Sequence, residues 1–173
     1  MIRVRSPHAV IGGVIRRAAR ISGGEPLGLR RQKLLARVLR CMPREEAHRA
    51  AAFLGEIVGA PFPDDRGELF AARRDPMLLA DQVRRAFLDW LRAETAQRPV
   101  VLVLEDLHWG DRPSVTLVDA ALGELAESPL FVLALARPEL DEVFPGLFAT
   151  RSVVEIKLSG LSKRASERLV RSA

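Results

Sequence analysis

The sequence between Pro99 and Asp111 reads Pro-Val-Val-Leu-Val-Leu-Glu-Asp-Leu-His-Trp-Gly-Asp. Its first part, Val100 to Glu105, predicts a β-strand, because five consecutive apolar residues precede an acid. A continuous apolar run, unlike an alternating one, is typical of a parallel strand that is covered on both faces by helices. This stretch therefore predicts an α/β fold.

Two carboxylates, Glu105 and Asp106, stand at the C-terminal end of this strand. Open α/β sheets bind their ligands at that end of the strands. Burying carboxylates is unfavourable unless a cation or hydrogen-bond donors meet them. Mg²⁺ is commonly held by one or two carboxylates together with substrate phosphates. The pair therefore indicates a metal-assisted phosphate site, although two acids at a strand end can also simply cap the next helix.

Two segments carry a family resemblance. Residues 104–111 (Leu-Glu-Asp-Leu-His-Trp-Gly-Asp) resemble the Walker B signature of STAND/AAA-type (AAA+ ATPase-like) regulatory ATPases, which belong to bacterial multidomain signal-transduction proteins. Residues 130–139 (Leu-Phe-Val-Leu-Ala-Leu-Ala-Arg-Pro-Glu) resemble the strand and sensor-1 segment of the same family. The two motifs occur in order and one helix apart, so the resemblance extends over the whole chain.

The resemblance implies a partial P-loop NTPase (AAA+-like) fold with a mostly parallel sheet of three to four strands, flanking helices and a helical insertion. The implied core covers residues 1–159, with the insertion at about 25–97 and the Walker B/sensor-1 part at about 99–159. Residues 160–173 would begin a helical lid subdomain. Strands are expected at 100–105, 130–136 and 152–158. The third would either pair with the second or wait for a partner segment.

The resemblance also implies roles for three residues. Glu105 would help to hold Mg²⁺, and Asp106 would share the metal and orient or deprotonate the attacking water. Arg137 matches the sensor-1 position, where a cation near the γ-phosphate stabilises charge in the transition state. His108 and Trp109 belong to the signature, and His108 is expected to be structural or a polar contact near the site.

The P-loop pattern G-x-x-x-x-G-K-[ST] is absent from the sequence. In P-loop enzymes that loop cradles the phosphates and supplies most of the nucleotide affinity. ATP and Mg²⁺ are thus implied by the family, but this chain alone is expected neither to bind ATP tightly nor to hydrolyse it. The expected partner is a missing N-terminal Walker A segment or another protein. Two alternatives remain open, a non-catalytic protein-interaction module and one half of a split ATPase.

Charge is distributed unevenly along the chain. Residues 1–50 contain 12 Lys and Arg against 3 Asp and Glu, whereas the whole chain carries a net charge of +5. An Arg-rich nucleic-acid binder is therefore a further alternative, but aromatic residues for base stacking do not interleave with the basic ones, which makes solvated helix faces the better interpretation. The sequence has no apolar run long enough to cross a membrane and a single cysteine, Cys41, so a cytoplasmic location is expected.

Helix signals are clear in several places. Ser6 is the expected cap of a first helix, and Asp75, followed by proline, is expected to cap a long amphipathic helix that ends near Thr95. Asp111 is the expected cap of the helix between the two motifs. Trp90 falls on the apolar stripe of the long helix, which makes it a core residue.

Overall fold

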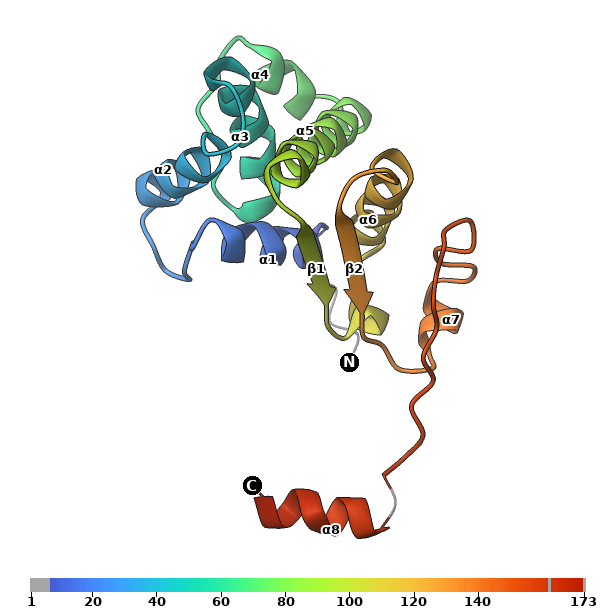
Figure 1. Cartoon of the computed structure of the whole chain (residues 1–173). Helices are drawn as coiled ribbons and strands as arrows, with labels where there is room; N and C mark the ends of the chain where they lie inside the picture. The colour runs from blue at the N-terminus through green and yellow to red at the C-terminus, as the bar shows by residue number, and fades with distance from the viewer. Residues whose placement is uncertain (1–6, 162, 173) are drawn as a thin grey trace.

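The computed structural model describes residues 7–161 and 163–172. Most of these residues lie in helices, and the rest of the regular structure is a small parallel sheet (Figure 1). The first five helices are α1 (Ala9–Ala18), α2 (Leu27–Val38), α3 (Arg44–Val58), α4 (Glu68–Arg73) and α5 (Pro76–Gln97). They are followed by β1 (Val100–Leu104), the 3₁₀ turn η1 (Leu107–Trp109), α6 (Arg112–Glu124), β2 (Leu130–Ala134), α7 (Leu140–Val143) and α8 (Lys163–Ser172).

The long helix α5 organises the helical part. It packs against α3, α4 and α6, and α3 in turn packs against α1 and α2. Phe53 of α3 and Phe87 of α5 are the largest fully buried side chains, and Trp90 is only 4% exposed, so its prediction as a core residue is confirmed. Burial of such large apolar side chains contributes roughly 1.5–3 kcal/mol each.

Two of the expected helix caps, Asp75 and Asp111, are present in the structure. The side chain of Asp75 accepts hydrogen bonds from the backbone N–H groups of Met77 (2.9 Å) and Leu78 (3.2 Å), as predicted. Asp111 caps α6 through the N–H of Ser114 (2.8 Å), also as predicted. Ser6 lies outside the described residues.

The expected sheet of three to four strands is wrong for the part of the chain that the structure describes. Its sheet has two strands, β1 and β2, paired in parallel with Val100 opposite Leu130 and Leu104 opposite Ala134. Helix α6 connects them, as the spacing of the two motifs predicts.

The expected third strand, residues 152–158, is also a wrong prediction. This segment has no regular secondary structure and its side chains are exposed, with Val154 and Leu158 both 87% exposed. It follows Arg151, whose guanidinium donates to Asp119 of α6 (3.0 and 2.8 Å). The chain then runs away from the sheet toward α8 (Figure 1). A strand-like pattern becomes a strand only when a neighbouring edge accepts its hydrogen bonds, and no such neighbour is found among the described residues.

The prediction that both faces of the first strand are covered is wrong as well. Leu102 and Leu104 are 5% and 1% exposed, and they join the core that also contains the apolar side of α6. On the opposite face, Val101 and Val103 are 60% and 45% exposed. In the described residues, one face of this sheet therefore lacks a covering layer.

Candidate functional site

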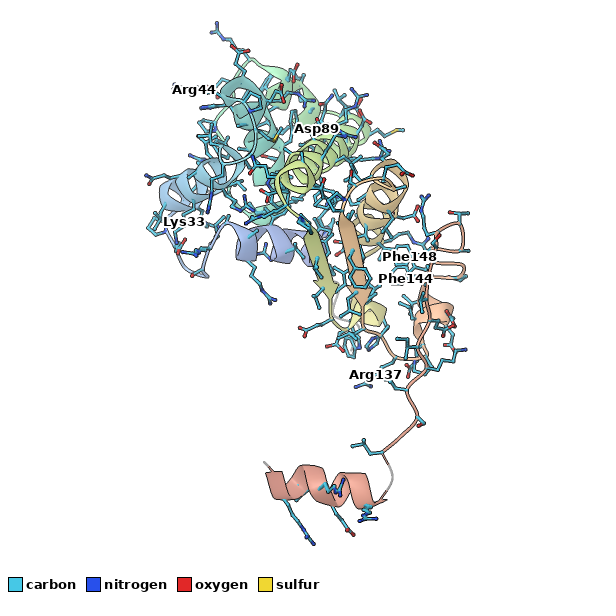
Figure 2. All side chains as sticks on the ribbon, in the orientation of Figure 1. Lys33, Arg44, Asp89, Arg137, Phe144 and Phe148 are labelled. Atoms are coloured by element: carbon cyan, nitrogen blue, oxygen red, sulfur yellow. The ribbon has the colours of Figure 1, made fainter. Side chains whose placement is uncertain are left out.

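The C-terminal ends of β1 and β2 bring the two predicted motifs to the same edge of the sheet. Parallel pairing continues beyond the strands, because Leu135 N donates to Leu104 O (2.9 Å) and Leu107 N donates to Leu135 O (3.0 Å). The residues that follow each strand therefore leave the sheet side by side. Figure 2 shows Arg137 beyond this end of the sheet.

Glu105 and Asp106 form a turn. The sequence instead predicted Glu105 as the last residue of the strand and Asp106 as the residue that follows it. β1 ends at Leu104, one residue earlier than expected, and both acids are exposed. Asp106 adopts a left-handed conformation (φ 53°, ψ 42°), which is unusual for a residue with a Cβ atom. Its carbonyl oxygen accepts a hydrogen bond from Trp109 N (2.8 Å), which closes the turn. Such backbone strain is often found at functional sites.

His108 connects the two motifs. Its Nδ1 atom accepts a hydrogen bond from the backbone N–H of Arg137 (3.3 Å), across 29 residues of sequence. An imidazole that accepts at Nδ1 is neutral and carries its proton on Nε2. His108 Nε2 is buried and has no hydrogen-bond partner among the described residues. The ring also meets Trp109 edge to face, with centroids 5.7 Å apart. The expectation of a structural or polar contact agrees with this geometry.

The side chains of the three predicted site residues make no ion pair and no hydrogen bond within the described part of the chain. Glu105, Asp106 and Arg137 are all exposed. The described residues also contain no group of three or more His, Cys, Asp or Glu side chains that could hold a metal ion. Mg²⁺ bound to a nucleotide is nevertheless usually held by only one or two protein carboxylates, because phosphates and water complete its shell. The residues therefore fit one side of a metal–phosphate site and do not form an independent metal site.

Asp111 holds this end of the sheet to the helical part of the molecule. Its carboxylate accepts hydrogen bonds from Ser114 N and Ser114 Oγ at the start of α6. It also accepts hydrogen bonds from the backbone N–H groups of His8 (2.8 Å) and Val10 (3.2 Å) at the start of α1. Burial alone raises the pKa of Asp111, but these hydrogen bonds outweigh it and hold the pKa below its usual value. Sequence reasoning found the first role of Asp111 and missed the second.

A second polar cluster was not predicted. Glu94 of α5 is 4% exposed and pairs with Arg37 of α2 through both carboxylate oxygens. Arg98 also donates to Glu94 Oε2 (3.0 Å). Burial raises the pKa of Glu94, but the guanidinium groups reverse this effect and lower it to about 2. A buried acid within the apolar stripe of α5 was the available signal in the sequence, but its partner lies 57 residues away.

One curated protein resembles part of this chain. Over 91 residues, half of its length, the chain is 30% identical to an uncharacterized protein of Rhizobium meliloti (strain 1021). The matched part covers 9% of that protein, so the chain spans less than a tenth of this curated relative. No protein-family model and no solved structure match the chain.

None of the helices among the described residues combines the length and the apolar character needed to cross a membrane.

Proposed function

We propose that this chain supplies the metal-facing and γ-phosphate-facing part of an ATPase site in a cytoplasmic signal-transduction protein. The observation that carries the proposal is the hydrogen bond from Arg137 N to His108 Nδ1 (3.3 Å). It links the acidic turn after β1 to the basic residue after β2, at the strand ends where α/β sheets bind ligands. The motif resemblance supplies the reaction class.

In this proposal each side chain has a defined task. Glu105 and Asp106 would hold the metal ion, and Asp106 would also orient or deprotonate the water molecule that attacks the γ-phosphate. Arg137 stabilises the charge that develops on the transferred phosphoryl group. When bound, Mg²⁺ and ATP supply the electrophilic phosphorus and the neutralising charge. The exposure of all three side chains leaves them available for these contacts.

The proposal includes inactivity of the isolated chain. Phosphoryl transfer depends on positioning and electrostatics, and in P-loop enzymes the glycine-rich loop with its lysine provides the phosphate cradle. The sequence contains no such loop. A second polypeptide segment that carries the loop is therefore the required partner.

The test uses two samples. The first is this chain with Mg²⁺-ATP in a calorimeter, for which we expect no binding at millimolar nucleotide and no turnover. The second is this chain expressed together with the segment encoded immediately upstream, for which we expect ATP hydrolysis. Glu105→Gln combined with Asp106→Asn is expected to abolish that hydrolysis, whereas Glu127→Gln, at an exposed acid away from the turn, is the control.

Two outcomes would overturn the proposal. ATP turnover by the isolated chain that depends on Glu105 and Asp106 would disprove its inactivity. An upstream segment that has no Gly-Lys-Ser/Thr loop and produces no turnover would remove the ATPase function itself.

A non-catalytic interaction module is the second candidate, and one specific observation favours it. The open face of the sheet presents large apolar side chains, which are Val101, Val103, Phe131 and Leu133. Each is between 42% and 61% exposed, and the strand register places them in two adjacent pairs. Contiguous exposed apolar surface of this kind marks interaction sites. Retained binding of a protein partner after both acids are removed would favour this candidate over the first.

Nucleic-acid binding has weaker support. Several basic side chains of the N-terminal part make internal contacts, such as Lys33 with Glu25 and Arg37 with Glu94. Arg31 donates to the carbonyl oxygen of Pro61 (2.5 Å). Side chains used in this way are less available to phosphates, which favours the structural interpretation of the positive charge.

A further inference from the structure

The outer edge of β2 has unused backbone hydrogen-bonding groups. In a parallel pair, alternate residues of a strand bond to the neighbouring strand, and the residues between them point away from it. Leu135 N donates to Leu104 O (2.9 Å), so Leu135 and the residues in phase with it face β1. The backbone groups of Val132 and Ala134 therefore point to the other side. No strand and no backbone partner meets them there among the described residues. An open strand edge of this kind can pair with another chain.

Residues 152–161, which we call the arm, lead from the body of the molecule to α8 (Figure 1). The backbone of the arm makes no hydrogen bond to any other part of the described chain. Its alternate residues Val154, Ile156 and Leu158 are apolar and between 77% and 87% exposed. This period of two is that of a β-strand with one apolar side. The arm thus has the sequence of a strand and lacks the neighbouring strand that would stabilise it.

The arm and the edge of β2 can satisfy each other in an assembly of two copies. Within one copy, the arm starts at Arg151, which is held by Asp119 of α6, and runs away from the sheet (Figure 1). We propose that the arm of each copy pairs in parallel with the outer edge of β2 in a second copy. Residues 152–158 are long enough to cover the five residues of β2. Each copy gives one arm and receives one, so the exchange closes as a two-fold dimer.

Charge determines the direction of this pairing. Helix α8, which follows the arm, contains four basic residues and one acid. The segment that follows β2 contains Glu139, Asp141 and Glu142, which are exposed and have no ion-pair partner within the described ranges. Parallel pairing brings α8 of one copy to the end of β2 where these acids lie, whereas antiparallel pairing would take it to the opposite end. Complementary charges at the rim of an interface select one orientation over the other.

The apolar side of the arm also matches the sheet. Phe131 and Leu133 of β2 are 61% and 42% exposed on the open face. In the proposed pairing, Val154 and Ile156 lie beside these two side chains. Aromatic and β-branched side chains on neighbouring strands stabilise a sheet. One contact thus covers part of two exposed apolar surfaces. The dimer does not depend on the proposed ATPase function.

The first test is the oligomeric state in analytical ultracentrifugation. We expect the parent chain to form dimers at roughly 100 μM, as a small interface allows. Ile156→Lys should be monomeric at the same concentration, because the charge would be buried against the partner. Ile156 is 77% exposed in the single copy, so this variant should keep the parent's stability in urea. Met77→Lys, at an apolar residue of α5 that is 84% exposed, is the matched control and should remain dimeric.

The second test is amide hydrogen exchange, which identifies the edge that is used. The amides of Val132 and Ala134 should exchange at least about tenfold more slowly in the parent than in Ile156→Lys at the same concentration, because the arm then bonds them. The amide of Val103 points to the outer edge of β1 and should be equal in the two proteins.

Four results would overturn the proposal. Slow exchange at Val132 in a monomeric parent would mean that the arm closes on its own sheet. A monomer with rapid exchange at Val132 would show that the edge stays open. Assemblies that grow beyond the dimer would exclude reciprocal exchange, and a dimer that Ile156→Lys leaves intact would exclude the arm.

Discussion

The backbone N–H of Arg137 donates a hydrogen bond to Nδ1 of His108, over a distance of 3.3 Å. This bond joins the segments that follow the two parallel strands, and with them the acidic and basic residues of the candidate site. It uses the backbone of Arg137, so the guanidinium is left free to act on a ligand. His108 is therefore a positioning residue for Arg137 in the proposed function.

We predict that His108→Ala accelerates hydrogen exchange at the Arg137 amide by about fivefold, since one neutral hydrogen bond contributes about 1 kcal/mol. The amide of Leu135, bonded to Leu104 within the strand ladder, should change much less. His48→Ala is the control, because His48 is exposed on α3. Equal exchange at Arg137 in the variant and the parent would show that the bond does not hold this segment.

Asp111 should be more important for stability than an ordinary helix cap. It accepts bonds from the first residues of α1 as well as α6. We expect Asp111→Ala to reduce the free energy of unfolding in urea by roughly 2–3 kcal/mol, because two capping interactions of about 1 kcal/mol each are lost and buried donors remain. Asp75→Ala removes a cap of α5 alone and should lower the free energy of unfolding by about 1 kcal/mol. Equal losses in the two variants would contradict the double role.

Glu94 should make stability depend on pH under acidic conditions. Its pKa in the folded state is about 2, below the usual value of 4.5, so its contribution is complete above pH 4.5. The contribution is lost as the pH falls from 4.5 toward 2, because the unfolded chain then binds the proton more tightly. The pKa of Asp111 is also lowered, so its contribution to stability is lost as the pH falls below the ordinary value of 3.8.

We expect Glu94→Gln to lower the free energy of unfolding by roughly 3 kcal/mol at neutral pH, since it leaves the Arg37 guanidinium buried without its counter-charge. The acid dependence of urea denaturation should become shallower in the same variant. Glu127→Gln, at an exposed acid, is the control. An unchanged slope between pH 4.5 and pH 2 would show that another group is responsible.

Cys41 should react slowly with alkylating agents. Burial and the nearby negative charge of Glu94 raise the pKa of its thiol to about 12, so the reactive thiolate is scarce at pH 8. We predict that iodoacetamide modifies native Cys41 at least about 100-fold more slowly than the chain unfolded in urea. Similar rates in the two states would contradict the described environment of this thiol.

Neighbouring residues of β1 should respond differently to truncation. Leu104 is 1% exposed, so Leu104→Ala should lower the free energy of unfolding, measured by urea denaturation, by roughly 2–5 kcal/mol. Val103 is 45% exposed on the open face. Val103→Ala should therefore lower the free energy of unfolding by less than about 1 kcal/mol. A large loss for Val103→Ala would mean that this face is covered in solution, for example by a second copy. Analytical ultracentrifugation of the parent chain distinguishes that case.

The sequence alone determined the features that depend on neighbours along the chain. Asp75 and Asp111 precede prolines at helix starts, and a carboxylate at that position bonds the first free N–H groups whatever surrounds it. The apolar spacing of α5 predicted the burial of Trp90 for the same local reason. The positions of β1 and β2 also followed from apolar runs, with ends one or two residues shorter than expected.

Tertiary structure decided what depends on distant partners. Residues 152–158 have a strand-like sequence but remain irregular, because β-structure requires a second edge and Arg151 is anchored to α6 through Asp119. Glu94 became the centre of a buried ion cluster because α2 brings Arg37 to it from 57 residues away. Local sequence specifies which hydrogen bonds a short segment can make with itself. Packing specifies which distant groups meet, because the free energy of burial depends on whatever surface lies opposite.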